Sequence, residues 1–550
     1  MFFVIFVNLI LHFAAARTVD YDFSIGWVNA NPDGRLVRPV IGINGAWPCP
    51  VIRVRKGDTL RVAVHNDLGN QSTSIHWHGI HQTGSAQMDG PPSISGCPIP
   101  PGQSFTYEFQ IDQPGTYWYH SHSSGQLVDG LRGPLIVEDP ENPYADEIEG
   151  EIVVTLTDWY HKQMPILIPY YLSPEQNADG AEPVPYSALI GESQNVSFFV
   201  QPNKTYMLRI INMAGFSQSL FQIDEHNMTI IETDGLYTQK QDVESLYVAT
   251  AQRYSVLIRT HQESMENFAI INALDLTMFD DTPAYLRPNT TGYLVYNPKA
   301  PLPEPPIVHN WNIIDDMAIQ PYIAQAPYGP VTHRINLSLG FFAAWNENRA
   351  GFNNISWLPQ KVPALYTALS APADYLHNPA IYGKFINPYI LRAGEVVEVV
   401  IENTDTGAHP LHMHGHQPQI ISRNPTPYAS KNDGFNGAGP YPQNPARRDT
   451  WLVAPGGETT IRFVADNPGV WLLHCHMEWH VIAGLTATFI EAPGVLQAQQ
   501  SRIAPQMESI CRSQGMGTVG NAGGNDVDWL DLSAARTQPD DEDGSMWPGS

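Results

Sequence analysis

The residues best suited to chemistry lie near the C-terminal end of the chain, in the run His474-Cys475-His476-Met477-Glu478-Trp479-His480. The preceding residues, 468–473, form an apolar run that starts at a Pro-Gly turn and predicts a buried strand. Because alternate side chains of a strand point to opposite faces, His474 and His476 should face one way and Cys475 the other. One strand could then bind metal on both faces, with the Cys475 backbone as a short covalent path between the two sites.

A cysteine thiolate with two imidazoles is the trigonal ligand set of blue-copper sites. Cys475 and His480 supply two of these three ligands, so a second histidine is needed. The segment 409–416 reads HPLHMHGH and offers four histidines. The competing interpretation is a histidine-rich surface loop that binds metal adventitiously.

Two further histidine pairs lie upstream, His76/His78 and His120/His122, each spaced by one residue and next to apolar or β-prone residues. On a strand, each pair would place two imidazoles on one face. A single pair of this kind is a weak signal, but two early pairs and two late pairs together form a strong one. The eight histidines match a three-copper cluster at an interface between distant parts of the chain.

With these four motifs the sequence resembles the multicopper oxidases, which include laccases, ascorbate oxidases and fungal iron-transport ferroxidases. The resemblance covers nearly the whole chain after the leader. It implies an all-β fold of three cupredoxin-like Greek-key β-sandwich domains. It also implies an enzyme with four copper ions that reduces O₂ to water with electrons taken from a small-molecule donor.

The resemblance also implies a role for each ligand. The type 1 ligands are His409, Cys475 and His480. The type 2 ligands are His76 and His412, and the two type 3 coppers are held by His78, His120 and His476 and by His122, His414 and His474. Leu485 occupies the axial type 1 position, ten residues after the cysteine. Leucine cannot ligate, so the resemblance implies a three-coordinate site of higher potential.

Residues 1–16 have an apolar core and a small-residue end, which predicts a secretory signal peptide. A membrane anchor is the alternative, but the run is short for a span. We expect domains at 17–140 (trinuclear ligands), 141–300 (no copper) and 301–495 (type 1 and trinuclear ligands). The second domain is expected to shape the substrate wall near the type 1 site. A C-terminal extension, 496–550, should be partly disordered, past Cys511.

The composition fits a secreted, extracellular or cell-wall protein, which we expect to be a monomer. Acidic residues number 55 and basic residues 29, which argues against a nucleic-acid partner. No second apolar stretch of spanning length follows the leader, so we expect no membrane association. Glycosylation sequons predict surface turns at Asn70, Asn195, Asn203, Asn227, Asn289, Asn336 and Asn354.

Other features follow from the resemblance. It implies a Cys97–Cys511 disulfide between the first domain and the extension, which leaves Cys49 as a buried free thiol. It assigns Asp89 and Glu478 to proton transfer toward reduced oxygen. A hydrogen bond from either acid to a ligand histidine is a structural interpretation that is compatible with this role.

The electron donor is a separate question. The second and third domains look closest to the fungal ferroxidases, which bind Fe²⁺ with acids beside the type 1 histidines. Asp405 and Asp280 match two of these acids, but they could also cap turns, and the third acid aligns with Phe199. An aromatic ring in place of a carboxylate would weaken a hard-cation site.

We therefore predict a laccase-like oxidase that oxidises phenolic or polyketide substrates, including by radical coupling of aryl units, in pigment or melanin biosynthesis. In such an enzyme Asp405 or Asp280 would accept the phenol proton. The alternative is a soluble ferroxidase, and a minor alternative is a non-catalytic copper-binding protein.

Overall fold

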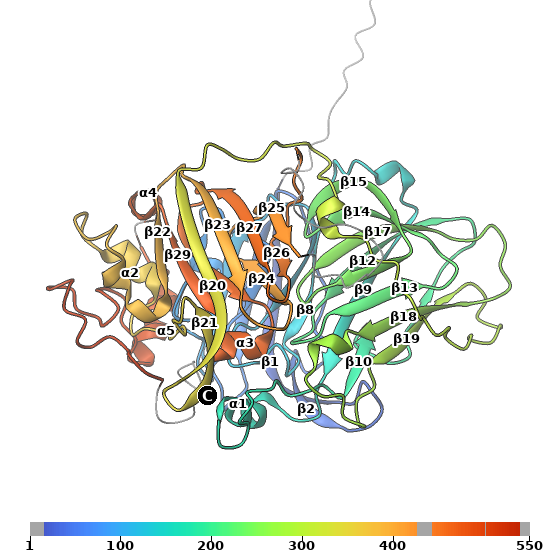
Figure 1. Ribbon diagram of the computed structural model, residues 1–550, viewed down its shortest axis with the longest axis horizontal. Coiled ribbons are helices and arrows are strands. Elements are labelled where there is room, and N and C mark those ends of the chain that lie inside the picture. Colours follow the sequence, from blue (N-terminus) through green and yellow to red (C-terminus); the bar gives the residue numbers. More distant parts are fainter. Residues whose placement is uncertain (1–15, 426–442, 501, 540–550) are drawn as a thin grey trace, which may run out of the picture.

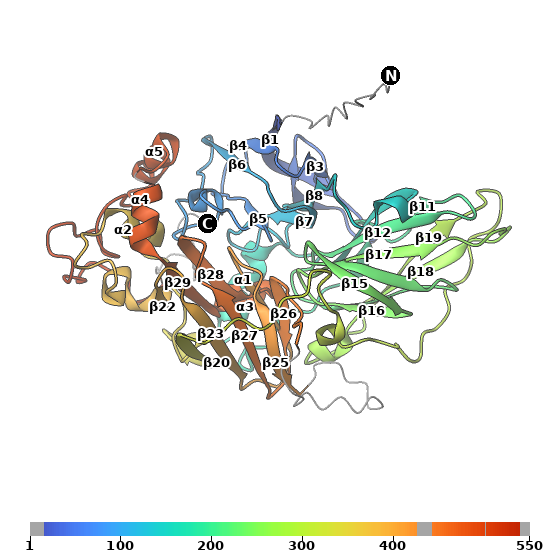
Figure 2. The same ribbon diagram turned by 90° about the horizontal axis from the view of Figure 1, so that it is seen from above.

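The computed structural model describes residues 16–425, 443–500 and 502–539 (Figure 1). The predicted signal peptide lies almost wholly outside these residues. Within them, strands dominate and pair into six sheets, two for each third of the chain. Seen from above, the blue first third, the green second third and the orange-red last third form a triangle (Figure 2). The all-β, three-domain cupredoxin fold is confirmed.

The first domain consists of two four-stranded sheets, with strand orders β2-β1-β4-β6 and β3-β8-β7-β5. Its core follows from alternation, because Leu60, Val62 and Val64 of one strand are buried while their neighbours are partly exposed. The strands are β1 (Thr18–Ala30), β2 (Arg38–Ile43), β3 (Ile52–Arg55), β4 (Thr59–Asn66), β5 (His76–His78), β6 (Ser104–Gln110), β7 (Gly115–His120) and β8 (Arg132–Glu138).

The second domain has a six-stranded sheet, β10-β9-β12-β17-β14-β15, and a five-stranded sheet, β11-β19-β18-β13-β16. Its strands are β9 (Gly150–Trp159), β10 (Ser187–Ile190), β11 (Ser197–Phe199), β12 (Thr205–Asn212), β13 (Ser219–Ile223), β14 (Met228–Thr233), β15 (Leu236–Val243), β16 (Ser245–Val248), β17 (Arg253–Arg259), β18 (Phe268–Leu274) and β19 (Asn289–Val295).

The third domain has two five-stranded sheets, β21-β20-β23-β27-β25 and β22-β29-β28-β24-β26. Its strands are β20 (His333–Ala344), β21 (Glu347–Phe352), β22 (Pro388–Leu391), β23 (Val396–Asn403), β24 (His409–Met413), β25 (Gln419–Asn424), β26 (Thr450–Val453), β27 (Glu458–Val464), β28 (Gly469–Cys475) and β29 (Thr486–Glu491).

Helices are short and lie between or after the sheets. The α-helices are α1 (Met164–Leu172), α2 (Ala364–Ser370), α3 (Glu478–Ala483), α4 (Pro493–Gln499) and α5 (Pro505–Ser513). The 3₁₀ turns are η1 (Ala86–Met88), η2 (Ala145–Glu147), η3 (Leu276–Met278), η4 (Asp316–Ala318), η5 (Pro379–Tyr382) and η6 (Lys384–Ile386). No helix in the described part of the chain combines the length and apolarity needed to cross a bilayer.

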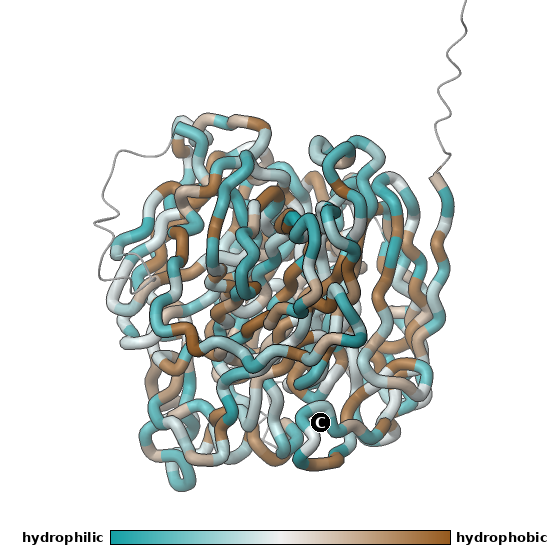
Figure 3. The backbone as a smooth tube through the Cα atoms, turned by 90° about the vertical axis from the view of Figure 1, so that its right-hand side faces the viewer, coloured by the Kyte–Doolittle hydropathy of each residue, from teal (hydrophilic) through white to brown (hydrophobic). Residues whose placement is uncertain are grey.

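Apolar segments run through the middle of the molecule, and polar segments are frequent at its periphery (Figure 3). One core cluster crosses the domain boundary, because it joins Trp77 and Phe105 of the first domain to Leu365 and Trp471 of the third. The first and third domains therefore share a hydrophobic core, and burial of this shared apolar surface holds their facing sheets together.

The C-terminal extension is attached to the first domain by α5. Cys511 of α5 forms a disulfide with Cys97, as predicted, and Cys49 is a buried free thiol. Beyond the helix, Trp529 is buried and Asn521 donates to the backbone carbonyl of Asp531. The expectation of disorder directly after Cys511 is therefore wrong for residues 512–539, and residues 540–550 lie outside the described part.

Candidate metal centre

Strand β28 carries the centre in the way that alternation predicts. It lies between β24 and β29 and pairs antiparallel with both. Cys475 Sγ lies 3.3 Å from His480 Nδ1 and 3.8 Å from His409 Nδ1. His474 and His476 instead contact the other histidine pairs. One strand thus serves two sites on its opposite faces.

The type 1 set is assembled by β24, β28 and α3. His409 begins β24 and His480 lies on α3, and their Nδ1 atoms are 3.1 Å apart beside the thiol. All three side chains are buried. Burial alone would raise the pKa of Cys475, but the charge of His480 and hydrogen bonds from both histidines lower it to about 6. A thiolate is therefore available at neutral pH, as copper binding requires.

Leu485 occupies the expected place beside this set. Gly484 ends α3 with φ of +99°, in the left-handed region, and turns the chain back toward β28. The Leu485 carbonyl then accepts a hydrogen bond of 3.2 Å from Cys475 N. The Leu485 side chain is fully buried in the same core cluster as Cys475 and offers no ligand atom.

The other eight histidines form one buried cluster between the first and third domains. Pairing of β5 with β7 sets His76 opposite His120, and pairing of β24 with β28 sets His412 opposite His474. Three groups have their ligand atoms within 4.8 Å of one another, namely His76/His412/His414, His76/His78/His120 and His122/His414/His474. The structure therefore brings together all the trinuclear residues that the sequence predicts, with His476 Nε2 lying 3.1 Å from His78 Nδ1.

Hydrogen bonds at one ring nitrogen leave the other nitrogen facing the cluster. Nδ1 of four histidines donates to a backbone carbonyl at 2.8–2.9 Å, in the pairs His76 to Asp89, His120 to Ser121, His412 to Asp449 and His474 to Cys475. Nε2 of His76, His120 and His412 is buried without a hydrogen-bond partner among the described residues. Buried polar atoms of this kind need a partner, and a bound metal would supply it.

His78 has the opposite orientation. Its Nε2 donates to Asp449 Oδ1 at 3.2 Å, so Nδ1 is the atom that faces His476. Burial lowers the pKa of His78 well below its ordinary value, and the same holds for His120, His122, His414, His474 and His476. Neutral imidazoles are the form that binds metal. The residues present fit a copper cluster.

The two predicted relay acids are both buried, and Asp89 contacts the cluster. Asp89 Oδ2 accepts a hydrogen bond of 2.8 Å from His414 Nδ1, so the structural role considered for Asp89 is present. Glu478 is the first residue of α3, and burial raises its pKa to about 7. A carboxyl group with this pKa can hold or release a proton near neutral pH. Proton transfer by either acid stays a prediction.

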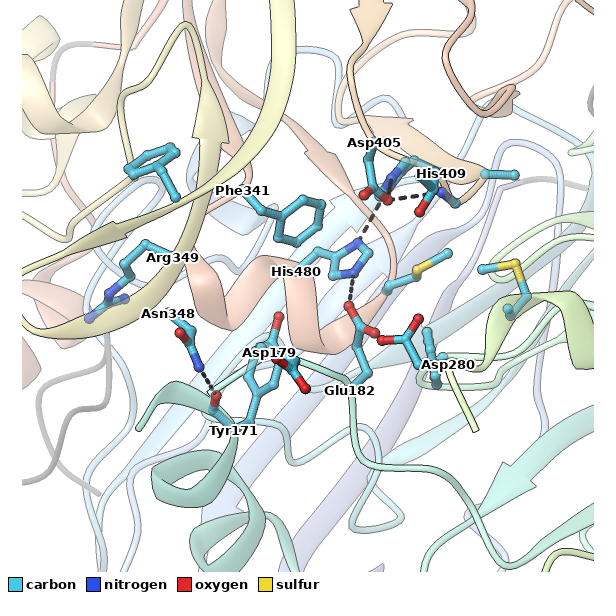
Figure 4. A pocket seen from close by; sticks show the side chains of 18 of the residues that line it. Tyr171, Asp179, Glu182, Asp280, Phe341, Asn348, Arg349, Asp405, His409 and His480 are labelled. Carbon is cyan, nitrogen blue, oxygen red and sulfur yellow. Dashed lines mark hydrogen bonds and ion pairs between the residues drawn. The ribbon is translucent and has the colours of Figure 1, made fainter. Parts of the chain in front are cut away.

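A cavity of about 500 Å³ opens beside the type 1 histidines (Figure 4). Asp405 Oδ2 accepts from His409 Nε2 at 3.0 Å, and Glu182 Oε1 accepts from His480 Nε2 at 2.8 Å. Asp280 and Asp179 also line the cavity. Burial, together with the charges of Glu182, Asp405 and Asp179, raises the pKa of Asp280.

Phe199 is a correction to the predicted site. It ends β11, is 66% exposed, and does not line this cavity. Glu182, in the irregular segment between α1 and β10, is the acid that lines the cavity and contacts the second type 1 histidine. Its partner His480 lies 298 residues away in sequence, so no local pattern marks the contact. The segment that carries it, Gly180-Ala181-Glu182-Pro183, has no periodic pattern that would single out the acid.

Comparisons with known proteins agree with this geometry. Residues 24–142, 150–299 and 357–495 match three models of the multicopper oxidase family. The iron transport multicopper oxidase fetC of Epichloe festucae is 45% identical over 536 residues, covering 96% of this chain and 85% of that protein. The iron transport multicopper oxidase FET3 of Saccharomyces cerevisiae is 40% identical, covering 96% and 84%.

Solved structures give the same result. The crystal structure of Fet3p, a multicopper oxidase that functions in iron import, matches with a TM-score of 0.90 and 40% identity over 95% of this chain and 99% of that chain. A laccase from Botrytis aclada matches with a TM-score of 0.77 and 29% identity, covering 90% and 91%. The pigment-type laccase prediction is therefore wrong, because proteins named for iron transport are the more similar relatives.

Ligand set, fold and relatives all lead to one assignment. The enzyme holds four copper ions, one of type 1, one of type 2 and two of type 3, and uses O₂ as its oxidant. From its three matched segments and its 40–46% identity to curated members, the chain belongs to the multicopper oxidase family.

Proposed function

We propose that this enzyme is a ferroxidase, which takes its electrons from Fe²⁺ bound in the cavity beside the type 1 site. One observation carries the proposal: Glu182 and Asp405 each accept a hydrogen bond from a different type 1 histidine. A cation bound by these carboxylates would be connected to each of the two type 1 histidines through a single hydrogen bond. The named relatives support iron as the donor.

The charge of the cavity suits a small hard cation. Burial alone would raise the pKa of Asp405, but the hydrogen bond and charge of His409 lower it to about 2, so Asp405 is ionised at physiological pH. The carboxyl groups of Glu182 and Asp280 point toward one another in Figure 4. Their mutual repulsion would be relieved by a cation with oxygen ligands. Carboxylates also stabilise Fe³⁺ more than Fe²⁺, which favours electron loss.

When bound, copper supplies one-electron acceptance at the type 1 site and four-electron reduction of O₂ at the trinuclear cluster. The chain's own part is to position the donor, through Glu182 and Asp405, and to connect the sites, through the Cys475 backbone between His474 and His476. Asp89 and Glu478 would supply protons at the cluster.

We also propose that the enzyme works outside the cytosol. A disulfide joins residues 97 and 511, and such bonds persist in oxidising compartments. The asparagines of the seven predicted glycosylation sequons are all exposed, as glycosylation requires: Asn70, Asn195, Asn203, Asn227, Asn289, Asn336 and Asn354. The prediction that they lie on turns is wrong for Asn289 and Asn336, which lie on strands β19 and β20.

Oxygen uptake by the copper-loaded enzyme tests the iron proposal. Glu182→Gln and Asp405→Asn should each lower kcat/KM for Fe²⁺ by about 10- to 100-fold, the range typical of losing one partner in a metal shell. Uptake driven by hydroquinone, which needs no cation site, should change much less. Asp281→Asn is the matched control, because Asp281 adjoins Asp280 in sequence but does not line the cavity.

Two results would contradict the proposal. One is a kcat/KM for a naphthol that exceeds the value for Fe²⁺ in the unaltered enzyme. The other is Fe²⁺ turnover that survives both carboxylate substitutions.

A further inference from the structure

Arg253 of the second domain extends into the interface between the other two domains. It begins β17 and is fully buried. Its Nη1 and Nη2 donate to Asp449 Oδ1 at 2.8 Å and Oδ2 at 2.6 Å. Its Nε donates to the Thr116 carbonyl of the first domain at 3.0 Å. One guanidinium group therefore connects all three domains, although its own domain contributes no copper ligand.

The carboxylate that Arg253 holds touches two ligand histidines. Asp449 Oδ1 lies 3.2 Å from His78 Nε2, and it lies 3.5 Å from His412 Nδ1. His78 belongs to a type 3 set and His412 to the type 2 set. Arg253 binds both oxygens of Asp449, and Thr450 Oγ1 also donates to Oδ1 at 2.9 Å. Because only the arginine holds both oxygens, it is the group that fixes the orientation of the whole carboxylate.

The sequence leaves room for this ion pair. Gly79, directly after His78, has φ of +90°, which favours glycine. A Cβ at this position would lie 2.5 Å from Arg253 Nη2 and 2.9 Å from Asp449 Oδ2. Neither atom could move away without breaking the bidentate contact. The glycine that follows the first histidine pair is therefore accounted for by its positive φ and by three close neighbours, the ion pair of Arg253 and Asp449 and the Tyr117 ring.

We propose that Arg253 is a positioning residue for the trinuclear cluster, which orients Asp449 so that His78 presents Nδ1 to its copper. A neutral imidazole carries one N–H, and the group that accepts it decides which nitrogen is free to ligate. At His78 the acceptor is the Asp449 side chain, whereas at His76, His120 and His474 it is a backbone carbonyl. A carboxylate can rotate where a carbonyl cannot, so it needs a second group to hold it.

The test compares Arg253→Met with Arg448→Met. Arg448 is equally buried and makes the same kind of bidentate contact, with Nε and Nη2 each 3.0 Å from Asp234. It also donates to the Arg253 backbone carbonyl at 3.3 Å, but it does not hold the Asp449 carboxylate, so it controls for the loss of a buried arginine beside the pair. Copper per chain, the type 2 EPR signal, the near-ultraviolet band of the type 3 pair and the blue type 1 band are measured on the full-length proteins.

Arg253→Met should weaken copper retention at the trinuclear cluster by about 10- to 100-fold and change the type 2 and type 3 signals. The blue band should remain, because the type 1 ligands do not touch Asp449. Arg253→Lys keeps the charge but cannot form two parallel hydrogen bonds. Its type 2 and type 3 signals should therefore be intermediate between those of Arg253→Met and those of the unaltered enzyme. Arg448→Met should keep four coppers with unchanged spectra. No iron is used, so the result is independent of the proposed ferroxidase activity.

Three outcomes would overturn the inference. The first is unchanged type 2 and type 3 signals in Arg253→Met, or in Arg253→Lys if the Met variant does not fold. The second is an equal loss in Arg448→Met. The third is loss of the blue band together with the fold in both Arg253 variants, which would show that the arginine is needed for folding alone. Gly79→Ala would place a methyl group against the ion pair of Arg253 and Asp449, so it should reproduce the changes in the type 2 and type 3 signals.

Discussion

At the scale of single residues, the hydrogen-bond acceptor of one ring nitrogen determines which nitrogen of a histidine can bind copper. His409 and His480 offer Nδ1 to the type 1 site because their Nε2 atoms are bound to Asp405 and Glu182. The same two carboxylates line the cavity in which we propose that Fe²⁺ binds. On this proposal, the same two side chains would orient the type 1 histidines and bind the substrate.

Leu485→Met should lower the reduction potential of the type 1 site. The thioether would add a weak axial ligand where a buried leucine now offers none, and axial ligation tunes the potential of such sites. Each drop of about 59 mV reduces the one-electron equilibrium constant tenfold, so electron uptake from Fe²⁺ should slow. A redox titration followed by the blue band measures the potential.

Leu485→Ile is the matched control for this prediction, because it changes the shape of the side chain without adding a donor. Its potential should stay close to that of the unaltered enzyme. A potential that stays the same or rises in Leu485→Met would refute the role assigned to the axial position.

At the scale of elements, the sequence predicts the directions of side chains within one strand, but it does not predict contacts between distant segments. Alternation along β28 correctly places Cys475 against the type 1 histidines and His474 and His476 against the cluster. The spacing of one residue in each histidine pair is a property of a strand, so it can be read without a partner. These patterns and the family resemblance suffice for the fold and the copper ligands.

Glu182 and Arg253 could not be found in this way. Glu182 lies in a segment without periodic pattern, and its partner is 298 residues distant. Arg253 begins an ordinary strand, and Asp449 lies 196 residues further along the chain. Contacts between irregular segments and between domains depend on tertiary packing, which the alternation of residues within one strand does not reveal. The substrate prediction failed for this reason, since it rested on the position of one acid.

Helix α5 attaches the C-terminal extension to the first domain. It is bound to the first domain by the Cys97–Cys511 disulfide and by a hydrogen bond from Gln514 to the Pro98 carbonyl. Cys511→Ser should lower the free energy of unfolding by about 2–5 kcal/mol, since the bond constrains a long loop of the unfolded chain. Copper content should not change, because α5 carries no ligand. Denaturant unfolding measures the loss.

Cys49→Ser is the control for this substitution, since Cys49 is a free thiol that closes no loop. It should destabilise the protein less than Cys511→Ser. Equal destabilisation by the two variants would mean that the disulfide contributes little beyond the packing of its sulfur atoms.

At the scale of the whole molecule, the two metal sites differ in what they join. The type 1 ligands, His409, Cys475 and His480, all belong to the third domain. The trinuclear ligands come in equal numbers from the first and third domains, which also share a hydrophobic core. Copper at the cluster therefore crosslinks two domains, whereas copper at the type 1 site stabilises one.

Copper removal should for this reason lower the thermal stability of the enzyme mainly through the trinuclear cluster. A ligand that binds only the folded state stabilises it by about 2.7 kcal/mol when present at 100 times its Kd, and the cluster binds three ions. Calorimetry of the apoprotein should show a lower Tm and a separation of the domain transitions, which copper loading should merge.

Cys475→Ser, which removes type 1 copper alone, should retain most of the copper-dependent increase in Tm. His414→Gln, which disrupts the cluster between the domains, should lose most of it. If Cys475→Ser instead abolished the increase and His414→Gln preserved it, the interdomain crosslink would not be the source of the stability.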